Sequence, residues 1–520
     1  MPGYYVENFG CRATQADGAA LERQFEERGV ERAGSAALAS VVVLNTCTVT
    51  AAADRDARAA IRRVRRQNPE ASIVVTGCYA QRAPEELAAI PGVSLVVGNS
   101  HKHQLAEIAV PRTMAGHSSD VWQGEQRVRR YATGTAEAAV PTLALPTLAL
   151  PTLALPTLAV PTLGNPSGFV SLAALTERPV FVSDIFAHTE LLAAPVFDAA
   201  NERTRPNLKI QDGCDNRCSF CVIPYVRGQS RSLERSRIVA EVTALVEAGY
   251  REVVISGINL GRWGRDLGPS TLDFGPQTSD SGARDHRATT HDLRLASLIR
   301  VILAETALEK LRISSVEPMD WSDELIGLVA TSPRIAKHAH VPMQSGSDAV
   351  LRRMHRKYRP WQYREKIETI RAAMPEAAIG ADVMVGFPGE TDAEFEETRR
   401  MVEDLPFTYL HVFTYSARPG TPAAEMRGQV PVQIARERNR VLREMAAQKK
   451  LAFMRGFVGG TVQAISLHVT GHDSAGGFTE ALTDNYLKMR VRGQHEANRW
   501  MLARVENVVE GSLVGGRVEA

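Results

Sequence analysis

The sequence is poor in cysteine, nearly balanced in charge and begins without a signal segment. Only six cysteines occur among 520 residues, and the formal net charge is +2 at pH 7. The first ten residues, MPGYYVENFG, contain no basic stretch followed by an apolar run, so we expect no secretory signal and a cytoplasmic, thiol-reducing location. Disulfide frameworks belong mainly to small secreted domains, so these cysteines are expected to serve another purpose. The charge balance neither favours nor excludes nucleic acid as a partner.

Apolar runs long enough to span a membrane are scarce as well. The stretch that most resembles a span, residues 141–163, reads PTLALPTLALPTLALPTLAVPTL and carries a proline at every fifth position. Each proline removes a backbone donor and clashes with the preceding turn, which excludes a continuous helix. We therefore predict a polyproline-like spacer within a linker or insertion over 111–205, with one or two docked segments and no membrane role.

The first 110 residues alternate short apolar runs with helical patterns. Three runs, YYVENFGC, SVVVLNTC and SIVVTGC, end at Cys11, Cys47 and Cys78, and a fourth, VSLVVG, occupies 93–98. The helical patterns lie at 14–28, 54–67 and 84–90. This alternation predicts a parallel, flavodoxin-like α/β domain over 1–110. Strand carboxyl ends meet along one edge of such a sheet, so the three thiols should converge as ligands; three buried structural thiols are the alternative.

The rest of the chain predicts two further domains, which makes the protein multidomain α/β. About six strand–helix units occupy 206–453, as in a barrel or partial barrel. The helical patterns lie at 234–248, 292–307, 359–373, 391–404 and 430–453. Residues 454–520 carry short strands between glycine-rich turns, which predicts a small β-barrel. No role is predicted for the insertion at 268–291.

The segment GCDNRCSFCVIP concentrates half of the cysteines within eight residues. Cys214, Cys218 and Cys221 follow a C-x3-C-x2-C pattern, with no fourth cysteine nearby. Structural zinc usually takes four protein ligands, whereas three thiolates suit a [4Fe–4S] cluster in which one iron lacks a protein ligand. Disulfides, and zinc completed by a distant histidine, stay open as alternatives.

This pattern, with Phe220 before the last cysteine, resembles the radical S-adenosylmethionine (SAM) superfamily. The N-terminal cysteines together with KIQDGCDNRCSFCVIPYVRG, SGINLG, VPMQSGSDAVLRRMHRKY and VGFPGE resemble the methylthiotransferases, strongly over 1–100 and 207–450 and more weakly over 456–520. The resemblance implies a radical SAM [4Fe–4S] cluster on Cys214, Cys218 and Cys221 and an auxiliary [4Fe–4S] cluster on Cys11, Cys47 and Cys78. It further implies that SAM yields a 5′-deoxyadenosyl radical and, in a second use, donates a methyl group.

Several further residues resemble positions that contact SAM. They are Phe220, Gly257 and Asn259 in SGINLG, and Gln344 and Ser345 in VPMQSGS. Ordinary turn chemistry is the alternative for the last four. Glu317 is expected to be a strand-end structural carboxylate, and His338 and His340 to be packing residues. No catalytic group beyond the cluster ligands is predicted.

The short motif NTCTVT at 45–50, followed by ADRDAR at 53–58, resembles the branch that modifies C2 of N6-threonylcarbamoyladenosine 37 in tRNA. The isopentenyladenosine-tRNA branch, the ribosomal-protein branch and a non-catalytic, metal-stabilised RNA-binding protein are the alternatives. The resemblance implies the tRNA anticodon loop, an electron donor and a sulfur donor as partners.

The tail resembles a TRAM domain, a small RNA-binding module, through Asn485 and Tyr486. Four of its arginines are expected either to contact phosphates or to form a solvated strand face. They are Arg490, Arg492, Arg499 and Arg504.

Overall fold

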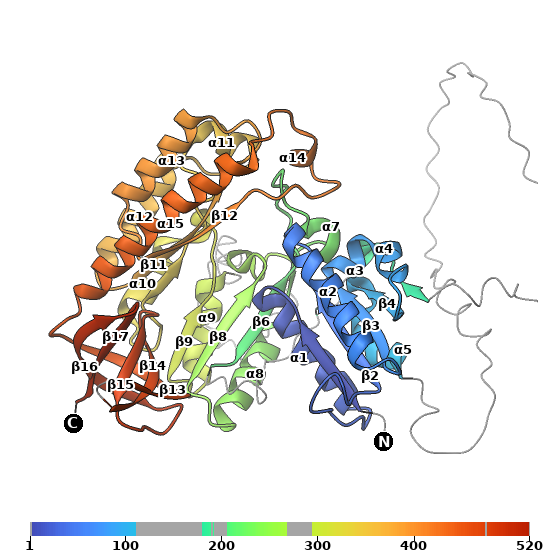
Figure 1. Ribbon diagram of the computed structural model, residues 1–520. Coiled ribbons are helices and arrows are strands. Elements are labelled where there is room, and N and C mark those ends of the chain that lie inside the picture. The colour runs from blue at the N-terminus through green and yellow to red at the C-terminus, as the bar shows by residue number, and fades with distance from the viewer. Residues whose placement is uncertain are drawn as a thin grey trace, which may run out of the picture. The chain divides into compact units, whose positions relative to one another are not determined.

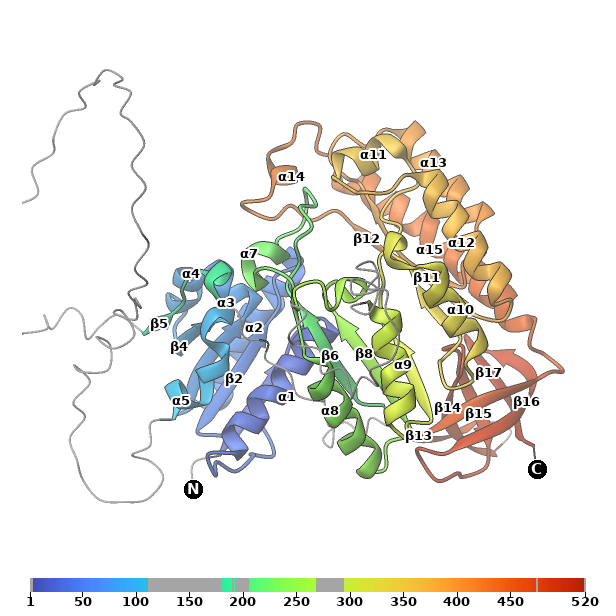
Figure 2. The ribbon, with the colours of Figure 1, turned by 180° about the vertical axis from the view of Figure 1, so that it is seen from behind.

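The computed structural model describes residues 3–110, 179–188, 191, 205–267, 294–473 and 476–518 (Figures 1 and 2). The proline repeat and the insertion at 268–291 lie outside these residues, so our expectations for them are not tested. None of the helices described is both long enough and apolar enough to cross a membrane. The predicted domain boundaries stay predictions.

The N-terminal sheet has the predicted parallel arrangement. Its strands are β1 (Tyr4–Asn8), β2 (Val41–Thr46), β3 (Ser72–Gly77), β4 (Val93–Gly98) and β5 (Val180–Phe181), and they pair in that order. A single-residue bridge also joins Arg32 to Tyr4 on the free side of β1. When this bridge is counted as the second strand, the bridge and β1 to β4 have the order 2-1-3-4-5, which is the order of flavodoxin-like sheets, and β5 is the sixth strand. The short strand β5 is a docked segment of the predicted linker, added at the far edge.

Helices follow these strands as the sequence indicated. They are α1 (Arg12–Glu26), α2 (Ala51–Gln67), α3 (Cys78–Arg82), α4 (Pro84–Ala88) and α5 (Leu105–Ala109). The helix α2 begins three residues earlier than predicted because the Thr50 hydroxyl accepts a hydrogen bond from the Ala53 backbone N–H at 3.2 Å. Each cysteine of this domain therefore lies between a strand and the start of a helix.

The central domain is a partial barrel of parallel strands, as predicted. One sheet holds β6 (Asn207–Asp212), β8 (Glu252–Gly257) and β9 (Lys310–Ile313), with β7 (Arg231–Ser232) antiparallel at its edge; the other holds β10 (His338–His340), β11 (Ala378–Val385) and β12 (Tyr409–Thr414). Parallel bridges from Leu311 to Ile335 and from Ser315 to His340 join the two sheets.

Helices cover the outer face of this barrel (Figures 1 and 2). They are α8 (Arg235–Glu247), α9 (Leu295–Glu305), α10 (Asp323–Thr331), α12 (Pro360–Ala373), α13 (Asp392–Asp404) and α15 (Val432–Arg455). Ile379, Ala381 and Val383 of β11 are fully buried in the core beneath them. Side chains alternate along a strand, so Gly380 and Asp382 face the barrel interior, where the neighbouring strands also present polar residues.

The C-terminal part is a closed β-barrel. Its strands are β13 (Thr461–Asp473), β14 (Gly476–Thr483), β15 (Lys488–Arg492), β16 (Trp500–Val509) and β17 (Ser512–Arg517). The small β-barrel predicted from the sequence is confirmed. The strands β14 and β17 were not predicted, because their glycine pairs, Gly476–Gly477 and Gly515–Gly516, weaken the strand pattern.

Candidate functional site

The three N-terminal cysteines, hereafter the N-terminal trio, meet at one edge of the first sheet. Cys11 precedes α1, Cys47 follows β2 and Cys78 opens α3. Two glycines allow this approach. A Cβ on Gly10, whose φ is +99°, would lie 2.5 Å from the Cβ of Cys47, and a Cβ on Gly77, whose φ is +100°, would lie 2.3 Å from the carbonyl oxygen of Thr46. Only glycine fits either position.

The N-terminal trio is close enough for its thiols to interact electrostatically. Burial, and then the neighbouring thiols of Cys78 and Cys11, raises the pKa of Cys47 to about 12. None of the six cysteines forms a disulfide. Within the described ranges, no three Cys, His, Asp or Glu side chains converge as the ligands of a single metal ion. Three thiolates are the donor set of a four-iron cluster with one open iron, whereas a structural zinc ion usually takes four protein ligands.

The second set, Cys214, Cys218 and Cys221, hereafter the barrel trio, lies on the loop between β6 and α7 (Ile223–Arg227). Gly213 permits the tight entry to this loop, because a Cβ there would lie 1.8 Å from the carbonyl oxygen of Gln229. Burial, then the thiol of Cys218 and further the thiol of Cys214, raises the pKa of Cys221 to about 12. The barrel trio is therefore also a mutually interacting group.

Nitrogen donors point at two sulfurs of the barrel trio. The Asn259 amide lies 3.6 Å from the Cys214 Sγ, and an Arg356 guanidinium nitrogen lies 3.4 Å from the Cys218 Sγ. Arg356 also pairs with Glu317, which is therefore more than a strand-end carboxylate because it holds the arginine against a cysteine. Such donors stabilise thiolates, the form that binds iron.

The two trios lie beside each other. Cys78 packs in one apolar cluster with Val222 and Val226, which directly follow the barrel trio in the chain. The Asn99 amide lies 3.6 Å from the Cys78 Sγ and donates a hydrogen bond to the Val226 carbonyl at 2.6 Å. One side chain thus links a cysteine of the first domain to the cysteine loop of the barrel.

Two of the residues predicted to contact SAM present acceptors without a partner in the described part of the chain. The backbone N–H of Asn259 donates to the Gln211 side chain at 2.7 Å, and Gly257 lies against the same glutamine. The amide oxygens of Asn259 and Gln344 are buried without a hydrogen-bond partner among the described residues. Gln344 also has a φ of +62°, which is uncommon for a residue other than glycine. Buried acceptors without partners fit a cationic ligand group such as an ammonium.

The remaining two predicted residues have partners within the protein. The Ser345 hydroxyl lies 3.1 Å from the Thr398 Oγ1 and accepts a hydrogen bond from the Ser347 backbone N–H at 3.1 Å, so it holds a turn against α13. The Phe220 ring meets the Phe387 ring edge to face at 6.4 Å, which joins the cysteine loop to the VGFPGE segment. Ser345 thus has the turn chemistry that the sequence left open as its alternative.

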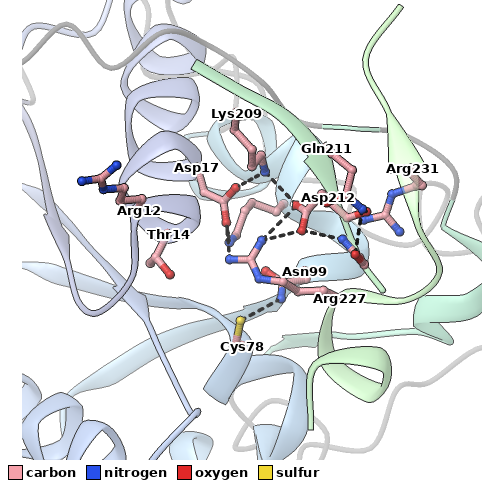
Figure 3. Close-up of polar contacts among 12 residues, drawn as sticks. Arg12, Thr14, Asp17, Cys78, Asn99, Lys209, Gln211, Asp212, Arg227 and Arg231 are labelled. Atoms are coloured by element: carbon pink, nitrogen blue, oxygen red, sulfur yellow. Dashed lines mark hydrogen bonds and ion pairs between the residues drawn. The ribbon is translucent and has the colours of Figure 1, made fainter. Parts of the chain in front are cut away.

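A buried ion cluster near Cys78 was not predicted. It joins α1, β6 and α7 and consists of Asp17, Lys102, Lys209, Asp212 and Arg227 (Figure 3). Arg227 lies 2.9 Å from both Asp17 and Asp212, and Lys102 lies 3.0 Å from Asp17. Burial would raise the pKa of Asp17, but Arg227, Lys102 and Lys209 outweigh it and hold that pKa well below its usual range. The lysine and aspartate of KIQD, within the strand that leads to Cys214, were the available signal.

The NTCTVT motif forms a second buried network. The Thr48 hydroxyl donates to the Asp54 Oδ1 at 2.6 Å, and Arg82 pairs with the Asp54 Oδ2 at 3.0 Å. Arg418, from the loop after β12, donates to the Thr48 Oγ1 at 2.7 Å and also pairs with Asp54. The motif therefore ties the N-terminal domain to the loop that follows the last barrel strand.

The arginines of the C-terminal barrel are mostly paired on its surface. Arg490 lies 3.0 Å from Glu510, Arg499 lies 2.8 Å from Glu496, and Arg492 pairs with Glu506. These pairs favour the solvated strand face over dedicated phosphate contacts. Asn485 donates to the Glu376 carbonyl at 2.9 Å, so it attaches the small barrel to the central domain.

Comparison with known proteins agrees with this architecture. Residues 3–98 match "Uncharacterized protein family UPF0004", and residues 208–402 match the radical SAM superfamily. A threonylcarbamoyladenosine tRNA methylthiotransferase, MtaB, of Aquifex aeolicus is 31% identical over 95% of this chain and 97% of its own length. MtaB of Bacillus subtilis is 32% identical over 94% of this chain and 90% of its own length. A tRNA-2-methylthio-N(6)-dimethylallyladenosine synthase of Erythrobacter litoralis is 31% identical over 89% of this chain and 86% of its own length. With these similarities over nearly its whole length, the chain belongs to the radical SAM methylthiotransferase family.

Proposed function

We propose that this protein is a tRNA methylthiotransferase that replaces the hydrogen at C2 of N6-threonylcarbamoyladenosine 37, beside the anticodon, with a methylthio group. SAM and its [4Fe–4S] cluster, when bound, supply a 5′-deoxyadenosyl radical that removes this hydrogen as 5′-deoxyadenosine. The sulfur comes from a sulfur donor, its methyl group from a second SAM, and the electron for SAM cleavage from an external reductant.

The adjacency of the two cysteine trios carries the proposal. Cys78 packs against Val222, one residue beyond Cys221, so groups held by the two trios would be neighbours. We assign the barrel trio to the radical SAM cluster and the N-terminal trio to an auxiliary cluster that holds the sulfur. An unreactive aryl carbon needs both groups at once, oriented and away from bulk water.

The chain's own residues would hold and orient these groups. The Asn259 and Gln344 amide oxygens are free to accept from the SAM ammonium, and we assign Gly257 and Phe220 to the same SAM site. Arg356, fixed by Glu317, and Asn99 would donate to the thiolate sulfurs of Cys218 and Cys78. We infer no separate proton-transfer residue.

The choice of base rests on the relatives. The first five of them carry the threonylcarbamoyladenosine name, at 29–32% identity. The isopentenyl-type enzyme of Erythrobacter litoralis is 31% identical, so the isopentenyl base is the competing substrate.

Mass spectrometry of tRNA nucleosides from a deletion strain tests the substrate. We expect loss of the methylthio-threonylcarbamoyl nucleoside alone, restored by the wild-type gene but not by a Cys218→Ala gene. Loss of the methylthio-isopentenyl nucleoside instead would show that the substrate is isopentenyladenosine. Loss of neither nucleoside would contradict the proposal. Anaerobically reconstituted protein with reductant should release 5′-deoxyadenosine from SAM; a non-catalytic RNA-binding protein would release none.

A further inference from the structure

The residue after Cys11 has a guanidinium that no acid neutralises within the described part of the chain. Arg12 is the first residue of α1, is exposed, and pairs with no carboxylate among the residues that the structure describes. Its Nη2 donates to the Tyr486 hydroxyl at 3.0 Å. Figure 3 shows the Arg12 side chain directed away from the ion cluster around Asp17. Arg12 is therefore available to a ligand next to the N-terminal trio.

The neighbours of Arg12 form an aromatic and histidine-rich wall of the barrel interior. His411 and Tyr409 of β12 have ring centroids 5.3 Å apart, and His340 of β10 lies 5.6 Å from His411. Tyr486 lies 6.3 Å from Tyr409. Burial first, and then the charge of His340, lowers the pKa of His411; Asp382 opposes this decrease, and the charge of Arg12 adds to it.

Positive charge exceeds negative charge around Tyr486. Besides Arg12, the guanidinium groups of Arg312 and Arg205 lie 5.1 and 5.8 Å from the centre of the Tyr486 ring. Among the described residues, Glu252 is the one carboxylate that pairs with these two arginines, at 2.6 Å from Arg312 and 3.6 Å from Arg205. Asp382 is a second acid at the wall and lies 3.4 Å from the His340 Nε2, so three guanidinium groups stand against two carboxylates, those of Glu252 and Asp382. The site is thus suited to an anion that also offers a flat, stackable group.

We propose that Arg12, with the His411 and Tyr409 wall, binds the carboxylate of the threonylcarbamoyl group and so selects this base over the isopentenyl base. The inference rests on the proposed function. On the purine ring, C2 and the carbon that bears N6 both flank N1, so the N6 substituent lies beside the reacting carbon. Arg12 directly follows a cysteine of the N-terminal trio, so it lies beside the proposed sulfur-bearing cluster as the N6 substituent lies beside C2. An apolar isopentenyl group offers no partner to a guanidinium, and its binding would leave that charge unpaired.

Synthetic anticodon stem–loops test this assignment. One loop carries the threonyl carboxylate, a second carries the neutral carboxamide, and binding and methylthiolation are measured for both. For the wild type we expect about a 10- to 100-fold preference for the carboxylate in Kd and kcat/KM, the range of a hydrogen bond to a charged group. Arg12→Gln should bring the preference close to one, Arg12→Lys should retain part of it, and Arg28→Gln, just past the far end of α1, should leave it unchanged.

Each other outcome overturns the inference in a recognisable way. If Arg12→Gln weakens both loops equally, Arg12 contacts an RNA phosphate instead. If Arg12→Gln keeps the wild-type preference, the carboxylate is bound elsewhere, while the proposed function stands. If the wild type methylthiolates neither of these loops but does methylthiolate a third loop that carries isopentenyladenosine, the proposed function and the inference fail together. Binding constants require no turnover, so a loss of activity alone cannot imitate the expected result.

Discussion

Asp17 of α1 and Arg227 of α7 form a buried ion pair, with Oδ2 and Nη2 2.9 Å apart and each side chain 2% exposed. The pair joins the helix that follows Cys11 to the helix that follows Cys221. Lys102 and Lys209 contact the same carboxylate, so Asp17 pairs with three buried cations, and Asp212 shares two of them, Lys209 and Arg227. The two cysteine-bearing segments are thereby fixed to each other by charge as well as by apolar packing.

Replacing Asp17 by alanine should destabilise the protein strongly. Removal of one partner from a buried ion pair leaves uncompensated charge and typically costs about 3–5 kcal/mol. We expect Asp17→Ala to lower the free energy of unfolding in urea by at least about 3 kcal/mol. Asp56→Ala, on the exposed face of α2, is the matched control and should change it little. Equal effects of the two substitutions would refute a structural role for the cluster.

His188 should make stability depend on pH. Burial, then the charge of Arg231, lowers the pKa of His188 from 6.5 to about 4. As the pH falls, His188 is therefore protonated in the unfolded chain before it is protonated in the folded protein. This difference lowers the free energy of unfolding progressively from about pH 6.5 down to about pH 4, and has no effect above pH 6.5. The thermal midpoint of the wild type should drop more steeply over this window than that of His188→Gln. If the thermal midpoints of the two proteins change equally with pH, His188 does not contribute to the pH dependence of stability.

A methyl group at Gly10 should disturb the N-terminal trio specifically. A Cβ there would lie 2.9 Å from the Cys47 Sγ, in addition to the strain of a φ of +99°. Gly29 has a φ of +70°, and a Cβ added there would meet nothing within 4 Å, so Gly29→Ala carries backbone strain without the contact. We expect Gly10→Ala to lose iron on reconstitution and Gly29→Ala to retain it. Iron loss in both variants would point to general instability instead.

Arg418 should couple the N-terminal domain to the barrel during catalysis. It contacts Thr48, the residue after Cys47, at 2.7 Å and pairs with Asp54. A small displacement of one reacting group can cost about a hundredfold in rate. Arg418→Gln should therefore form at least about tenfold less methylthio product per 5′-deoxyadenosine released. Arg427→Gln, exposed just beyond the short helix α14 (Pro422–Glu425), should match the wild type. If Arg418→Gln forms as much methylthio product per 5′-deoxyadenosine as the wild type, Arg418 does not couple the two domains during catalysis.

The local part of the site could be predicted from the sequence. Cys11, Cys47 and Cys78 each follow a short run rich in aromatic or β-branched residues, and the topology of parallel sheets brings such strand ends to one edge. Cys214, Cys218 and Cys221 are close in sequence and needed no topology at all. For both trios, periodicity and spacing contained the information.

The contacts between domains could not be predicted in this way. Asp17 and Arg227 are 210 residues apart, and nothing in either local pattern distinguishes them from surface charges. Arg12 meets Tyr486 across 474 residues, for the same reason. Such pairs depend on how separately folded units dock, which hydrophobic periodicity does not encode.

Iron and acid-labile sulfide per chain, after anaerobic reconstitution, test the central claim most directly. Two clusters, each on its own trio, predict about eight irons for the wild type, about four for Cys78→Ala and about four for Cys218→Ala, with SAM cleavage kept only in Cys78→Ala. About four irons in the wild type, or an undiminished count in Cys78→Ala, would contradict an auxiliary cluster on the N-terminal trio.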